Sequence, residues 1–121
     1  MFDAPPDHFE WLVDLCHKAE GVEHDLMWGD ELVFRFGEAM FCLFRLENKR
    51  TVAVTFRPPP EEREKLLAHP AVEKASFPAV GEWIKVQEEV LASPSHPHFI
   101  SREQLSHWVR RSYEMARQEA A

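Results

Sequence analysis

The stretch LVFRFGEAMFCLFRLENKRTVAVTF, residues 32–56, decides the fold, because it reads as three consecutive strands joined by two tight turns. In residues 32–36, large apolar side chains alternate with Val33 and Arg35, which is the period of a strand with two different faces. Gly37-Glu38 fits a two-residue hairpin turn. Residues 39–46 are almost wholly apolar and predict a central strand with both faces covered. After a polar turn at 47–50, alternation resumes over residues 51–56.

Helices are predicted before and after this meander in the sequence. Asp7 is a good N-cap, with Glu10 three residues later, and predicts a helix over about residues 7–20. Residues 24–28 are a candidate short leading strand. The Pro58–Pro60 triplet begins a short helix that reaches about residue 69. Residues 83–86 predict another strand, residues 92–100 a loop, and a capping box at Ser101 begins the last helix. The order α-β-β-β-α-β-α predicts one α+β domain over residues 1–121, with helices packed on an antiparallel sheet.

Composition limits the functional classes. The net charge of −7 argues against a generic nucleic-acid binder, although the charge is uneven. The first 30 residues hold eight acids and one base, whereas residues 31–57 hold three acids and five bases. The longest apolar run has six residues, so no membrane span is predicted. With no signal-like N-terminus, a cytoplasmic protein is expected, in which Cys16 and Cys42 are buried free thiols.

Several segments in sequence order resemble the MmcQ/YjbR family of small bacterial proteins. They are Gly21-Val22-Glu23, residues 34–43 with their Gly37, Trp83, and Ser112-Tyr113, and the resemblance covers about residues 7–116. It implies an α+β fold and a DNA-binding function. The chain departs from the family pattern at residues 76–82, SFPAVGE, where many members carry a basic stretch before the tryptophan strand.

Two surfaces are candidate binding sites. Five basic residues of the meander could gather along one face of the sheet and contact nucleic-acid phosphates: Arg35, Arg45, Lys49, Arg50 and Arg57. An ordinary solvated surface is the alternative interpretation, because glutamates are interspersed among these residues. Trp28, beside Gly29 at a turn, and Trp83 are candidate groove aromatics. The second hypothesis is therefore a protein-interaction or homodimerising domain that uses an exposed aromatic patch.

Catalytic and metal motifs are missing from the sequence. His96 and His98 form the one close histidine pair, and no H-E-x-x-H or Cys/His cluster accompanies it. The serines lack a nucleophile-elbow context, and no glycine-rich phosphate loop is present. We therefore expect a non-enzymatic binding module without a metal or cofactor. It would bind DNA weakly through the hairpin or, as the alternative, another protein or a second copy of itself.

Overall fold

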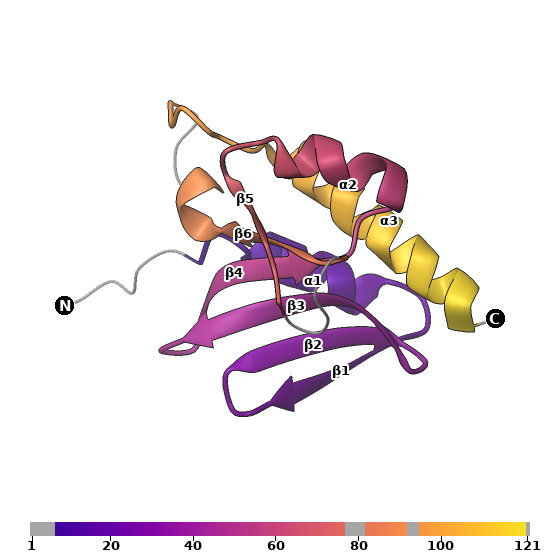
Figure 1. Cartoon of the computed structure of the whole chain (residues 1–121). Coiled ribbons are helices and arrows are strands. Elements are labelled where there is room, and N and C mark those ends of the chain that lie inside the picture. The colour runs from indigo at the N-terminus through magenta and orange to yellow at the C-terminus, as the bar shows by residue number, and fades with distance from the viewer. Residues whose placement is uncertain (1–6, 77–81, 92–94, 121) are drawn as a thin grey trace.

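The computed structural model describes residues 7–76, 82–91 and 95–120. The departure from the family pattern at residues 76–82 and the loop predicted at residues 92–100 therefore lie partly outside the described residues. The protein is an α+β domain with one six-stranded antiparallel sheet (Figure 1). The elements follow in the order α1 (Glu10–Lys18), β1 (Val22–Met27), β2 (Glu31–Phe36), β3 (Ala39–Glu47), β4 (Arg50–Phe56), α2 (Pro60–Leu67), β5 (Val72–Lys74), β6 (Ile84–Gln87), the 3-10 helix η1 (Glu88–Leu91) and α3 (Arg102–Ala120). The spatial strand order is β1-β2-β3-β4-β6-β5.

The meander forms as predicted, with β3 inside the sheet and with residues in left-handed backbone at both of its turns. Phe36 pairs with Ala39 across a turn in which Gly37 has φ of 60°. Across the next turn Asn48 and Lys49 have φ of 53° and 64°, values that match the twist of a two-residue hairpin. The predicted element order lacked β5, because three residues are too short to show a period, and it counted no strand for β1, which was only a candidate at residues 24–28.

The main core lies between the sheet and the helices α1 and α3. Helix α3, yellow in Figure 1, crosses one face of the sheet, and α1 lies on the same side. Phe34 and Phe44 from the sheet meet Leu12 from α1 and Val109 from α3. A smaller cluster on the opposite face contains Val33, Leu43, Ala75 and Trp83. The aromatic density of the meander is therefore mostly interior.

The start of α1 differs from the prediction. The helix begins at Glu10, and Asp7 does not close a capping box with it. The carboxylate of Asp7 accepts hydrogen bonds from the backbone N–H of Phe9 and that of Thr51, both at 3.0 Å, and from the Thr51 hydroxyl. Asp7 thus ties the entry of α1 to β4, a partner 44 residues away that local sequence does not reveal.

Helix α3 is anchored by two neighbouring residues that lie in the segments shared with the MmcQ/YjbR pattern. The buried Ser112 hydroxyl donates to the carbonyl of Phe41 at 2.6 Å and accepts from the N–H of Arg57 at 3.0 Å. Phe41 is the extra residue of a β-bulge, since the register passes from Cys42 directly to Met40. The Tyr113 hydroxyl donates to the carbonyl of Glu20 at 2.6 Å, which holds α3 against the end of α1.

Candidate functional site

The end of β1 exposes two large apolar side chains. Among the described residues, Leu26 and Trp28 are the exposed large hydrophobics, at 58% and 67%. Trp28 sits in the left-handed region with φ of 54°, followed by Gly29 at 77°. A bulky residue in this conformation, which the turn between β1 and β2 requires, carries strain of about 1–2 kcal/mol. We call Leu26, Trp28 and Gly29 the exposed corner.

The exposed corner is held in place by the neighbouring hairpin. The N–H of Asp30 donates to the carbonyl of Met27 at 3.3 Å, and the carbonyl of Asp30 accepts from the N–H of Leu46 at 2.7 Å. β1 is the outermost strand of the sheet, drawn in indigo at the bottom of Figure 1, and one side of it has no strand partner among the described residues. The corner therefore lies at a free sheet edge on an ordered turn.

Acidic groups surround this edge. Glu23 and Asp25 on β1 pair with Arg35 of β2 at 2.9 and 2.8 Å. Burial raises the pKa of Glu31, and the neighbouring carboxylate of Asp30 adds to the effect. The edge thus carries exposed apolar area on the helix side and acidic side chains on the other side, because alternate residues of β1 face opposite ways.

The five predicted phosphate-binding residues do not gather on one surface. Arg35 lies opposite Met40 near the Gly37 turn, whereas Arg45 lies opposite Glu31 at the other end of the same hairpin. Arg57 directly follows β4, whereas Lys49 and Arg50 lie at the other end of that strand.

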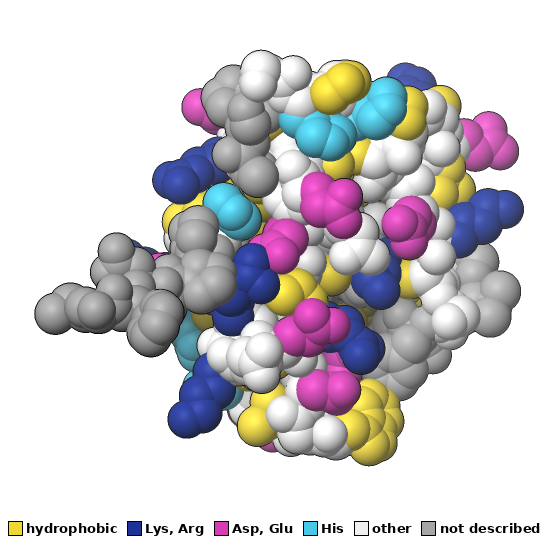
Figure 2. Space-filling model, turned by 90° about the vertical axis from the view of Figure 1, so that its left-hand side faces the viewer, with side chains coloured by type: hydrophobic (Ala, Val, Ile, Leu, Met, Phe, Trp, Pro, Cys, Tyr) yellow, Lys and Arg dark blue, Asp and Glu magenta, His cyan; other side chains and the backbone are white. Residues whose placement is uncertain are grey.

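Four of these five basic residues already form ion pairs with carboxylates. Arg35 pairs with Glu23 and Asp25, Arg45 with Glu31 at 3.7 Å and Glu47 at 3.8 Å, Arg50 with Glu88, and Arg57 with Glu119. Lys49 is exposed and makes no ion pair with a described residue. Figure 2 shows Lys and Arg side chains mixed with Asp and Glu on the side of the molecule that carries the β1–β2 and β3–β4 turns. The convergence expected from the sequence is absent from the described residues.

Trp83 is placed differently from Trp28. It is 6% exposed and belongs to the small cluster on the second face of the sheet. The guanidinium carbon of Arg57 lies 5.9 Å from the centre of its ring. The indole also lines a hollow of about 640 Å³ together with Arg63 and Glu64 of α2. Trp83 is therefore a packed residue at the edge of a hollow, and it offers no open stacking surface.

Neither a metal centre nor a reactive thiol is formed by the described residues. No group of three His, Cys, Asp or Glu side chains there is placed to hold a metal ion. Cys16 and Cys42 are both buried and free, as predicted. Burial raises the pKa of the Cys42 thiol well above its ordinary value, and its hydrogen bond with Cys16 adds to this. A protonated, buried thiol is a poor nucleophile.

Within the described segments, no helix is both long enough and apolar enough to cross a membrane.

Sequence reasoning found Trp28 but missed Leu26. The strand β1 has the burial pattern of an uncovered edge, with four exposed residues between two half-buried ends. Leu26 faces the helix side of the sheet opposite Leu32, but it is not among the residues that pack against the main core. In the sequence, a short acidic strand followed by a turn at Trp28 indicates the edge of a sheet. An apolar residue on such an edge is not covered by a helix.

Comparison with known proteins agrees with the fold. A crystal structure from Pseudomonas syringae superposes with a TM-score of 0.66 at 17% identity, covering 88% of this chain and 97% of that one. The Deinococcus radiodurans protein DR2400, which contains a DUF419 domain, superposes with a TM-score of 0.75 at 19% identity, covering 99% and 86%. At such identities the likeness shows a shared fold. No curated protein matches significantly. The YjbR family model matches residues 18–115, which is most of the chain, and the chain belongs to the YjbR family.

Proposed function

We propose that this YjbR-family protein is a non-enzymatic protein-interaction module that binds its partner at the exposed corner. The observation that carries the proposal is the exposure of Leu26 and Trp28, at 58% and 67%, in a domain whose other described large apolar side chains are covered at least in part. Tryptophan at a rigid, exposed position is typical of the anchors that dominate protein interfaces. The left-handed backbone at Trp28 supports the same reading, because glycine or asparagine would suit that conformation better.

The charge of the edge indicates what the partner presents. Glu23, Asp25 and Asp30 lie on or next to β1, and the first 30 residues carry seven more acids than bases. Complementarity therefore favours a protein segment with an apolar anchor flanked by Lys or Arg. A second copy of this chain is a poorer partner, since antiparallel pairing of two β1 edges would bring Glu23 and Asp25 against the same acids.

Binding of nucleic acid through the hairpin has weaker support. A phosphate would have to displace a carboxylate from four of the five predicted contacts, leaving Lys49 as the readily available cation. The proposed cytoplasmic location rests on the two buried free thiols, which are typical of a reducing compartment.

A peptide selection tests the proposal. We would select a randomised peptide library displayed on phage against the wild-type protein, a Leu26→Thr/Trp28→Asn variant and the control Met115→Gln on α3. Threonine suits a strand and asparagine tolerates left-handed backbone, so the variant keeps the fold while losing the apolar area. We expect wild type and control to enrich peptides with an apolar residue flanked by Lys or Arg, and the variant to enrich none.

Two results would contradict this function. One is the absence of any enriched motif with the wild-type protein. The other is tight binding of labelled duplex DNA that falls steeply with added salt and is lost in Lys49→Gln, because phosphate contacts release counterions. That outcome would favour nucleic-acid binding through the hairpin.

A further inference from the structure

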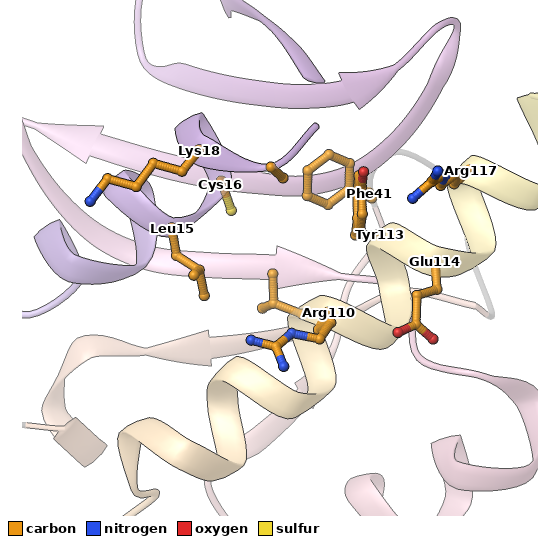
Figure 3. Close-up of a pocket in the computed structure, with 10 residues that line it drawn as sticks. Leu15, Cys16, Lys18, Phe41, Arg110, Tyr113, Glu114 and Arg117 are labelled. Atoms are coloured by element: carbon orange, nitrogen blue, oxygen red, sulfur yellow. The ribbon is translucent and has the colours of Figure 1, made fainter. Parts of the chain in front are cut away.

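A second hollow lies on the helix side of the molecule, away from the β1–β2 turn. It is a cleft of about 340 Å³ between α1 and α3. Leu15 and Cys16 line it from α1, Val109 and Tyr113 from α3, and Phe41 from β3 beneath them. Figure 3 shows these side chains around the space between the two helices. The volume lies at the lower end of the range for small-molecule sites, and most of the interior is apolar.

The opening of this cleft is positively charged. Lys18 from α1 and Arg110 and Arg117 from α3 line it, against one carboxylate, Glu114. None of these three cations forms an ion pair with a carboxylate in the described part of the chain. By contrast, Arg111 on the same helix pairs with Glu61, Glu62 and Glu114. In a protein of net charge −7, three exposed cations left unpaired at one opening stand out from the neutralised arginines of the sheet.

The cleft is formed in advance of any ligand. Its floor residue Phe41 is fixed by the hydrogen bond from Ser112 to its carbonyl, and the rings of Phe41 and Tyr113 meet edge to face at 5.3 Å. Tyr113 in turn holds the end of α1 through the carbonyl of Glu20. A pre-formed site avoids the cost of ordering its walls on binding.

We propose that the cleft binds a small amphipathic carboxylate, with its apolar part against the half-buried Leu15, Ala19 and Tyr113 and its carboxylate at Arg110 at the opening. Apolar walls favour a hydrocarbon or aryl group, and unpaired guanidinium groups favour a carboxylate, to which they can donate two parallel hydrogen bonds. This site is independent of the exposed corner, and either one can exist without the other.

The test uses octanoate as the probe and the neutral octanamide as its isostere. We would titrate each into the full chain by calorimetry and follow the same titrations by amide chemical-shift changes in NMR spectra. The variant Arg110→Gln/Arg117→Gln removes two charges at the cleft. Lys49→Gln/Lys74→Gln removes two charges elsewhere and is the matched control. All four side chains are exposed, so folding is preserved.

We expect saturable binding of octanoate, with the largest shift changes at and around Phe41 and Tyr113. Octanamide and the double arginine variant should each bind about tenfold more weakly, since each loses charge-assisted contacts. The lysine control should stay within about twofold of wild type. The proposal is overturned if octanoate does not saturate, if octanamide binds equally well, if both double variants lose affinity equally, or if the shifts cluster outside the cleft.

Discussion

Replacing Ser112 by alanine should destabilise the protein far more than an ordinary serine substitution in a helix. Its hydroxyl satisfies two backbone groups, the carbonyl of the bulged Phe41 in β3 at 2.6 Å and the N–H of Arg57 just after β4 at 3.0 Å. The side chain is 1% exposed, so water cannot easily replace it. Leaving a buried polar group unpaired costs about 1–3 kcal/mol, and two are affected.

Alanine favours a helix more than serine does, which offsets about 0.5 kcal/mol of this loss of stability. The free energy of unfolding should therefore fall by about 2–5 kcal/mol, a large part of the stability of a domain of this size. Urea unfolding followed by circular dichroism measures this loss. Ser106→Ala is the matched control, because Ser106 lies on the same helix and makes no hydrogen bond to a described residue. A loss below about 1 kcal/mol with an unchanged slope in urea would refute the reasoning.

Three further predictions concern the stability of the fold and the accessibility of the cysteines. Gly21→Ala should lower the free energy of unfolding by about 2 kcal/mol or more, because φ is 75° and the new Cβ would lie 2.6 Å from the Phe36 ring; an unchanged urea midpoint would contradict this. Burial raises the pKa of Glu31, so the contribution of this residue to native stability should fall as pH rises through the window that begins at the ordinary glutamate value of 4.5. Glu31→Gln should accordingly raise the urea midpoint at neutral pH and lose that advantage below pH 4.5, and a gain independent of pH would exclude ionisation as the cause. Cys16 and Cys42 should react with a thiol reagent only as fast as the protein unfolds, and rapid labelling of the native protein would show that they are accessible.

Local pattern predicts those parts of the fold whose determinants are close in sequence. The turn at Gly37-Glu38, the largely apolar β3 and the capping box at the start of α3 all formed as expected. In that box the Ser101 hydroxyl accepts from the N–H of Gln104 at 3.2 Å, and the Gln104 side chain accepts from the N–H of Ser101 at 3.0 Å. Such contacts span three residues and can be read from a sequence.

Contacts between distant residues explain what the sequence did not show. Asp7 accepts a hydrogen bond from the backbone N–H of Thr51 in β4. The sequence alone indicated only a helix cap at this position. Arg50 and Arg57 pair with Glu88 and Glu119, which lie far along the chain, and this removed the expected basic surface.

The α1–α3 cleft escaped prediction for the same reason. Arg110 and Arg117 occur on a helix that also carries Glu114 and the ion-paired Arg111, so the sequence alone suggested an ordinary solvated face. The cleft requires the packing distance between two helices, and no local pattern encodes that distance.

The affinity of an enriched peptide for the wild-type protein and for Trp28→Asn tests the role of the exposed corner most directly. Fluorescence anisotropy of the labelled peptide, measured at two ionic strengths, gives both dissociation constants. Loss of a central tryptophan anchor costs about 2 kcal/mol or more, so Trp28→Asn should bind at least about 30-fold more weakly, whereas Met115→Gln should match wild type. Equal affinity for wild type and Trp28→Asn would show that the partner binds elsewhere.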